Sequence, residues 1–169
     1  MSITAGTDQA GGLYSLKPSK GRVQFCSRCG AIPGARERRT ARDQAERVCD
    51  VCGMGVMLST ARGALLKAGS AFLVVTDDLR VTAVSQPAEV LIGQETSVLG
   101  ANLLSLLSCP SGDSELAART ARAANGARDV VELPVTVEGA IGAAPFLARI
   151  ASCGPPRGAL LTVTPALTS

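Results

Sequence analysis

The segment AFLVVTDDLRVTAVSQPAEVLIG, residues 71–93, determines how the second half of this chain folds. Residues 71–78 form a nearly continuous apolar run that ends in two aspartates, as expected for a buried strand followed by an acidic turn. A second strand, RVTAVSQ, follows, so residues 71–86 predict a hairpin across Asp77, Asp78 and Leu79. Between Pro87 and Gly93 the sequence then predicts a short helical piece.

The residues downstream continue with helices and then with strands. The sequence predicts a second helical piece at 100–107, a longer helix over 112–126, and strands at 129–138, 144–152 and 158–167. In the first of these strands, valine and leucine alternate with polar residues, which indicates one buried face. The order of strand, strand, helices and three strands predicts an α+β domain whose antiparallel sheet carries helices on one face.

Upstream, two short cysteine motifs stand out: CSRCG at 26–30 and CDVCG at 49–53. Their spacing, C-x2-C-x19-C-x2-C, is typical of a structural zinc site. Each CxxC can curl into a tight turn, in which the glycine that follows lets backbone amides point at the thiolates. Cys26, Cys29, Cys49 and Cys52 would then hold one Zn²⁺ in a closed tetrahedron. Over residues 22–58 the pattern resembles a small β-rich zinc ribbon, a family whose members bind nucleic acid or protein, or are purely structural.

Other uses of these cysteines stay open. The same four thiolates suit a single iron, as in rubredoxin-like electron carriers, or a redox switch that releases zinc on oxidation. Between the motifs lies an arginine-rich loop, with Arg36, Arg38, Arg39 and Arg42. These arginines could contact phosphates, but interleaved acidic residues favour a solvated, charge-balanced segment. We expect the remaining two cysteines, Cys109 and Cys153, to be small buried apolar residues.

Composition narrows the possible functions of the 169-residue chain. It contains no histidine, which excludes Ser-His-Asp and Cys-His catalysis and histidine-ligated haem. Aromatic residues make up only 2%, which argues against stacking platforms for single-stranded nucleic acid. Residues 1–69 hold 11 Lys/Arg and 5 Asp/Glu, a net charge of +6, whereas residues 70–169 hold 6 and 9, a net charge of −3. This asymmetry indicates two modules with different surfaces.

No targeting or membrane-spanning segment is recognisable in the sequence. We expect a flexible N-terminal tail over residues 1–21 and a cytoplasmic location. In such a reducing compartment, paired CxxC motifs read as metal ligands more readily than as disulfides.

Within residues 74–107 the sequence resembles a PAS sensor domain. The residues that carry the resemblance are Asp77-Asp78 in the turn, Gln86-Pro87-Ala88 where the family has Asn-x-Ala, Leu91 and Gly93 for Leu-x-Gly, and Gly100 with Leu103, Leu104, Leu106 and Leu107. With the later helix and strands, the resemblance covers residues 70–167. It implies a five-stranded antiparallel sheet with helices on one face, and a homodimer formed through a helix before the first strand. We expect that helix, which would also link the two modules, over residues 59–69.

The resemblance also implies an interior that is either a filled core or a pocket for a small ligand. The pocket would be lined by Val74, Val84, Leu91, Leu103, Leu107, Leu133, Val135 and Ile150. Gly100-Ala101-Asn102 is followed by Leu103, where the photoactive flavin branch needs a cysteine, so that photochemistry is excluded. The shortage of aromatic and amide side chains disfavours any other flavin.

These features predict a non-enzymatic signalling or regulatory protein. A PAS-like sensor or dimerisation domain would be coupled to a structural zinc ribbon, and the ribbon would engage a protein partner. The alternative is a nucleic-acid-binding transcriptional regulator that uses the ribbon and its arginine-rich loop.

Overall fold

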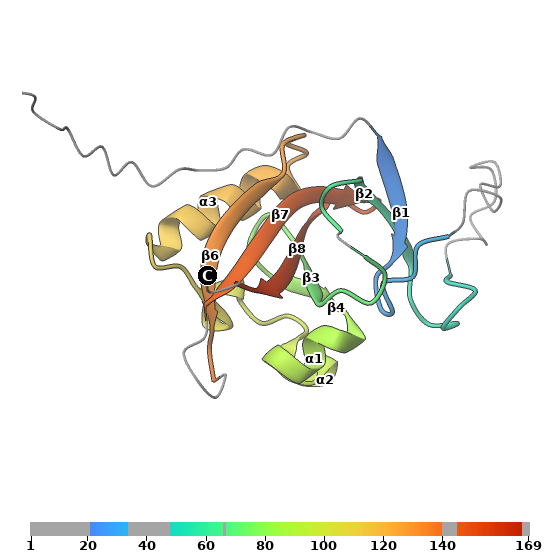
Figure 1. Cartoon of the computed structure of the whole chain (residues 1–169), viewed down its shortest axis with the longest axis horizontal. Helices are drawn as coiled ribbons and strands as arrows, with labels where there is room; N and C mark the ends of the chain where they lie inside the picture. The colour runs from blue at the N-terminus through green and yellow to red at the C-terminus, as the bar shows by residue number, and fades with distance from the viewer. Residues whose placement is uncertain (1–20, 34–47, 66, 140–144, 167–169) are drawn as a thin grey trace, which may run out of the picture.

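The computed structural model describes residues 21–33, 48–65, 67–139 and 145–166. In these ranges eight strands form one antiparallel sheet, and three α-helices and a 3-10 turn accompany it (Figure 1). The strands are β1 Arg22–Cys26, β2 Met57–Ala61, β3 Phe72–Val75, β4 Val81–Val84, β5 Leu107–Ser108, β6 Val131–Val137, β7 Phe146–Gly154 and β8 Gly158–Pro165. The helices are α1 Gln86–Ile92, α2 Glu95–Val98, α3 Asp113–Ala124 and the 3-10 turn η3 Leu103–Ser105.

The sheet runs in the order β1-β2-β7-β8-β3-β4, and β6 adds to β7 and to the short β5. On one edge, strand β7 therefore has two partners. Its first half pairs with β6, from Phe146 opposite Val135, and its last residues pair with β2, where Cys153 lies opposite Thr60. The arrangement is β-rich and antiparallel with few helices, in keeping with the predicted α+β class.

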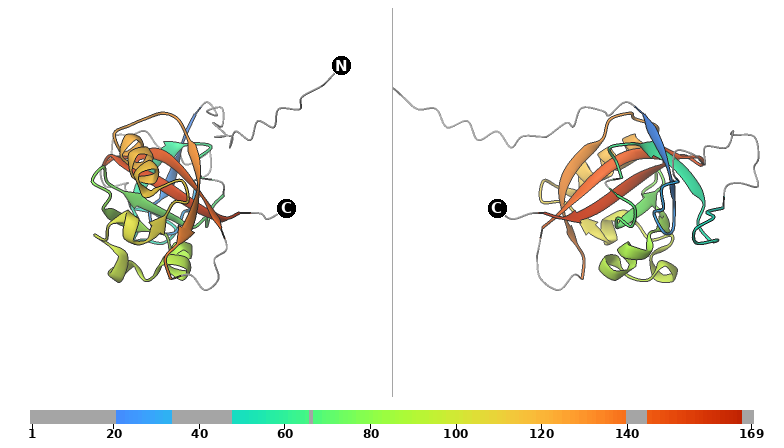
Figure 2. Two further views of the ribbon diagram at one scale, coloured as in Figure 1. Left: turned by 90° about the vertical axis from the view of Figure 1, so that its left-hand side faces the viewer. Right: turned by 45° about the vertical axis from the view of Figure 1, so that its right-hand side comes forward.

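The helices pack on one face of this sheet. Side chains of β3 alternate between the faces: Leu73 and Val75 point into a core that also contains residues of α1, α2 and α3, whereas Phe72 and Val74 point the other way. Helix α3 packs across β7 and β8, and α1 and α2 lie below β3 and β4 (Figures 1 and 2). Because β3 and β8 are covered on both faces, their sequences read as almost unbroken apolar runs.

The cysteine module covers part of the second face. Phe25 of β1 and Leu58 of β2 join Phe72, Ala151 and Leu160 of the sheet in a separate apolar cluster. The rings of Phe25 and Phe72 meet edge to face, with centroids 5.4 Å apart and planes at 90°. The β1–β2 hairpin thus belongs to the same sheet as the second half of the chain (Figure 2). It also shares this buried cluster with that half.

The helix predicted over residues 59–69 is wrong. Met57–Ala61 form β2, and a turn follows, with residue 66 outside the described ranges. Thr60 is drawn into the sheet: it lies opposite Cys153, and its hydroxyl donates to the Ser152 carbonyl at 2.9 Å. Pairing with a strand some 90 residues away overrides the local helical pattern. The dimerisation helix inferred from the resemblance is therefore missing from this stretch.

The predicted tail, residues 1–21, lies outside the described residues apart from Gly21. None of the helices in the described part of the chain has the length and apolar character that crossing a membrane requires.

Candidate metal centre

Four cysteines meet where the β1–β2 hairpin leaves the sheet. Cys26 ends β1 and Cys29 lies in the turn after it; we call residues 26–30 the first knuckle. Cys49 and Cys52 lie in the segment before β2, which an isolated bridge between Val48 and Val56 closes; we call residues 48–56 the second knuckle. All four Sγ atoms lie within 4.8 Å of one another. The predicted clustering of both CxxC pairs is confirmed, and the cluster could hold a metal ion such as zinc.

The sulfur geometry fits a tetrahedral ion. Four sulfurs at ~2.3 Å from one Zn²⁺ stand about 3.8 Å apart. Across the knuckles, Cys26 Sγ lies 3.6 Å from Cys52 Sγ, and Cys29 Sγ lies 3.8 Å from Cys49 Sγ. Cys26 and Cys49 are buried and the other two are partly exposed. A set of four thiolates suits zinc or iron and leaves no open position for a substrate.

Backbone geometry explains why these knuckles close. The N–H of Gly30 donates to the Cys26 carbonyl, and that of Gly53 donates to the Cys49 carbonyl, at 3.0 and 2.8 Å. Both glycines have a φ near +68°, which favours glycine. The amides that reach sulfur belong to other residues: Arg28 and Cys29 donate to Cys26 Sγ, and Gly55 donates to Cys52 Sγ, at 3.3 to 3.5 Å.

Gly55 is the point of closest approach between the knuckles. A Cβ at this position would lie 2.1 Å from Cys26 Sγ and 3.0 Å from both Cβ and N of Arg28. The second knuckle also bonds directly to the first, because Ser27 N–H donates to the Val56 carbonyl at 2.9 Å and the Ser27 hydroxyl accepts from Val56 N–H at 3.0 Å. The sequence did not distinguish Gly55 from the neighbouring glycines, because its role depends on contacts with the other knuckle.

The four thiols differ in how readily they lose a proton. Burial raises the pKa of Cys26 to about 12, although the backbone amides of Cys29 and Arg28 act against it. Burial likewise raises the pKa of Cys29. The backbone N–H groups of Met54 and Gly55 lower the pKa of Cys52 to about 6. Since metal ligands are thiolates, a metal must displace the protons from the first knuckle, whereas Cys52 is already a thiolate at neutral pH.

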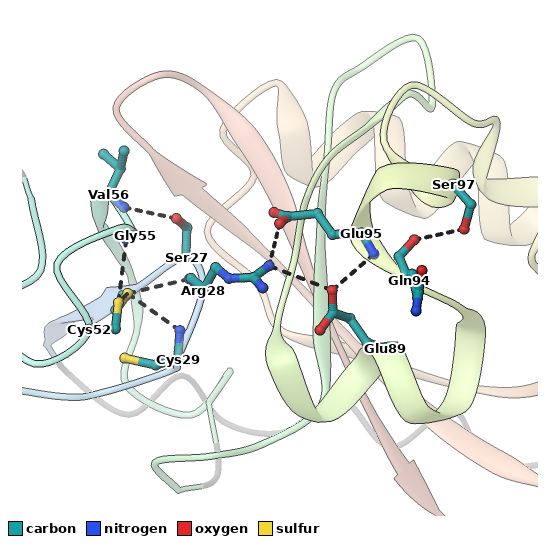
Figure 3. A network of polar contacts seen from close by, with 11 residues as sticks. Ser27, Arg28, Cys29, Cys52, Gly55, Val56, Glu89, Gln94, Glu95 and Ser97 are labelled. Atoms are coloured by element: carbon teal, nitrogen blue, oxygen red, sulfur yellow. Dashed lines mark hydrogen bonds and ion pairs between the residues drawn. The ribbon is translucent and has the colours of Figure 1, made fainter.

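Arg28 connects the first knuckle to the helices. Its guanidinium forms ion pairs with Glu95 of α2 and, at 3.6 Å, with Glu89 of α1 (Figure 3). Its carbonyl accepts from the N–H of Gln86, the first residue of α1, at 2.9 Å. Sequence reasoning missed this residue: its partners lie more than 55 positions away, and only its place inside a CxxC motif set it apart from other arginines.

The residues predicted to line a pocket lie in the apolar clusters of the sheet and not at this centre. Arg36, Arg38, Arg39 and Arg42 lie outside the described residues. We call the core between the sheet and the helices the helix-side core. Six of the predicted pocket residues are buried in it: Val84, Leu103, Leu107, Leu133, Val135 and Ile150. Leu91 packs against it. Val74 was assigned wrongly, because it points to the opposite face of the sheet, into the cluster with Phe25 and Phe72. Sequence alternation alone did not tell which face of a doubly covered strand meets the helices.

One hollow at the edge of the helix-side core has a volume of about 10 Å³, lined by residues that include Arg119, Arg122, Asp129 and Ile150. This is about the space that one water molecule needs. Cys109 and Cys153 are buried, as predicted, and they lie in different clusters. Burial raises the pKa of Cys153 to about 12.

The second knuckle exposes apolar side chains around the cysteines. Val51 and Met54 are 77% and 71% exposed, and Val48 and Val56 are also exposed. We call these four residues the apolar knuckle surface. Comparison with known proteins adds no assignment for the centre: no protein-family model matches the chain, and no curated protein matches it.

Proposed function

We propose that this protein is a non-enzymatic regulatory protein in which a structural zinc ribbon, residues 22–58, is joined to a PAS-like domain, residues 70–167, and binds a protein partner. The observation that carries the proposal is the apolar knuckle surface. Four exposed apolar residues within nine positions, on a turn held by metal ligands, are typical of an interaction site rather than of a solvated loop. A metal-held knuckle presents such side chains on a rigid frame.

The arrangement of the second half supports the PAS-like part of this proposal. Strands β4, β3, β8, β7 and β6 are neighbours in that order, and α1, α2 and α3 lie in sequence between the first two strands and the last three. The helices contribute to the core on one face, as the resemblance implies. The β1–β2 hairpin covers part of the other face.

The donor set supports a structural role for zinc. Four sulfur ligands complete a tetrahedral coordination shell, and two of the four are buried. All six cysteines are free thiols in the structure, which suits a reducing compartment, and we propose the cytoplasm. A small ribbon gains from the metal much of the stability that its own core cannot supply.

The interior favours an interaction role over small-molecule sensing. Seven of the eight residues predicted to line a pocket pack into or against the helix-side core. The hollow of about 10 Å³ beside Ile150 is far smaller than the ~300 Å³ at which ligand sites begin. In this proposal the PAS-like domain has a filled core, binds no small molecule, and acts by contacting another protein.

The test is cross-linking mass spectrometry in a lysate of the source cells with three forms of the zinc-loaded protein. A double variant, Val51→Ser with Met54→Ser, removes the most exposed part of the apolar knuckle surface without touching a metal ligand. Val90→Ser is the matched control, because Val90 is 87% exposed on α1. We expect one partner to be captured by the wild type and the control and lost from the double variant. Equal capture by all three forms would contradict the proposal.

The nucleic-acid alternative is tested with the same preparations. Fluorescence anisotropy with a duplex and a single strand at low salt would show binding that falls steeply with added salt if the arginine-rich loop contacts phosphates. If substitution of Arg36, Arg38 and Arg39 abolished that binding, the nucleic-acid function would be supported in place of the protein-partner function. Native mass spectrometry of the wild type reports the metal and whether the protein is a homodimer, which we also propose.

A further inference from the structure

Arg28 belongs to the metal centre and to the helical part of the core at once. Its backbone N–H donates to Cys26 Sγ at 3.3 Å, and its carbonyl accepts from Gln86 at the start of α1. Its guanidinium pairs with Glu89 and Glu95, and all three side chains are 22–30% exposed, so water screens these pairs only in part. A shift of this residue would disturb both neighbours.

The position of Arg28 depends on closure of the two knuckles. Gly55 of the second knuckle packs against Cys26 Sγ and against the backbone of Arg28, so closely that a Cβ at this position would overlap both. The four thiolates can stay within 4.8 Å of one another only if a cation balances their charge. Without it, thiolate repulsion or protonation removes the force that holds the second knuckle on Arg28.

Helices α1 and α2 depend on such outside contacts. They have seven and four residues, and helices this short do not persist in water on their own. Glu89 accepts a hydrogen bond from the N–H of Glu95 at 2.9 Å, which joins the two helices (Figure 3). Only Ala88 and Val98 of these helices are fully buried, while Leu91 and Ile92 pack against the core from partly exposed positions.

We propose that the metal centre and the α1–α2 segment, residues 86–98, form one conformational switch with Arg28 as the positioning residue between them. When metal is bound, the first knuckle holds Arg28 against Glu89 and Glu95, and α1–α2 is ordered. When metal is lost, Arg28 is released and α1–α2 opens, while the sheet and α3 remain folded. By linkage, if metal binding changes the affinity of α1–α2 for a partner by some factor, the partner changes the affinity for the metal by that same factor.

The charges near the metal centre make the proposed coupling distinguishable from a simple through-space effect on zinc affinity. Zn²⁺ with four thiolates carries a net charge of −2, the same sign as Glu89 and Glu95. Acting only through space, Glu89 and Glu95 would oppose the metal-loaded state, and neutralising them would strengthen metal binding. Coupling through Arg28 predicts the opposite.

Hydrogen exchange of the full chain tests the switch directly. Exchange is followed by mass spectrometry in the zinc-loaded protein and after removal of zinc with a chelator. We expect exchange in peptides from residues 86–98 to become at least about tenfold faster, while peptides from α3, Asp113–Ala124, stay protected. Unchanged exchange over 86–98 would overturn the proposal. An equal increase in α3 would also overturn it, since the metal would then support the whole fold.

A second test measures the zinc affinity of variants and does not depend on detecting an opened α1–α2 segment. For Glu89→Gln with Glu95→Gln, we expect Zn²⁺ affinity, measured by competition with a chromophoric chelator, to fall by roughly three- to tenfold. The control is Glu115→Gln, which removes the half-exposed pair with Arg119 on α3. Unchanged or tighter zinc binding in the double variant would overturn the coupling, as would an equal loss in the control.

This proposal rests on the metal centre and not on the partner. If the purified chain binds no zinc in either assay, the structural-zinc part of the proposed function fails together with the switch. If it binds one zinc but the helices do not respond, only the switch fails.

Discussion

Replacing Gly55 with alanine should separate the two knuckles and weaken metal binding. The added Cβ would stand 2.1 Å from Cys26 Sγ, whereas ordinary contacts begin at 3.4 Å, so about 1.3 Å of movement is needed. The groups in its path are a metal ligand and the backbone and Cβ of Arg28, none of which is the end of a flexible side chain. The strain must therefore be relieved by opening the centre.

The size of the effect follows from what the movement does to the ligands. The two sulfur pairs across the knuckles are 3.6 and 3.8 Å apart, close to the tetrahedral spacing, and an opening of this size takes at least one thiolate out of bonding range. We expect Zn²⁺ affinity to fall by at least ~10–100-fold, a range typical of disturbing a ligand through its surroundings. That range corresponds to about 1.4–2.7 kcal/mol.

The assay is chelator competition on the purified protein, with Gly53→Ala as the matched control. Gly53 lies two residues away and has a φ of +67°, but a Cβ there meets no atom within 4 Å. Its replacement costs backbone strain of about 1–2 kcal/mol without blocking the closure of the knuckles. The reasoning would be refuted if Gly55→Ala bound zinc within threefold of the wild type, or if it lost no more affinity than Gly53→Ala.

Three further predictions concern the ligands, pH and the shared core. Cys26→Ser should reduce bound zinc from one equivalent to almost none by elemental analysis, whereas Cys109→Ser should keep one equivalent; equal zinc contents would contradict the assigned ligands. Because burial raises the pKa of Cys26 and Cys29, both thiols are protonated at neutral pH, and zinc must displace at least two protons. Zinc affinity should therefore rise by at least about 100-fold per pH unit between pH 6 and 8, and a flat profile would contradict this. Phe25→Ala should lower the free energy of unfolding of the zinc-loaded protein by about 3–5 kcal/mol in urea, since Phe25 is fully buried against Phe72, and a loss below about 1 kcal/mol would contradict its place in the core.

The elements whose signals are local could be predicted from the sequence. The hairpin at 71–86 appears as β3 and β4, and the helix at 112–126 appears as α3. The clustering of the four cysteines was also predictable, because two CxxC motifs at this spacing are typical of a metal site. The hairpin and the helix depend on residues close together in the sequence, and the cysteine cluster depends on a recognisable spacing of two motifs.

The features that depend on distant residues could not be predicted. Residues 59–61 read as the start of a helix until β7 supplies a strand partner from position 153. The second core could not be predicted because nothing in the sequence near Phe25 and Leu58 indicates that they pack against Phe72, Ala151 and Leu160. The role of Arg28 depends on two carboxylates that only the folded chain brings to it.

Strand β7 has a consequence for where this chain can be divided. Because β6 and β2 share one of its edges, the change in composition near residue 70 does not mark an independent unit. A fragment that began there would leave the second half of this edge unpaired and would expose Phe72, Ala151 and Leu160 to water. We expect such a fragment to aggregate. A chimera that exchanged the cysteine module would need a replacement that supplied both the missing strand and its half of the buried cluster.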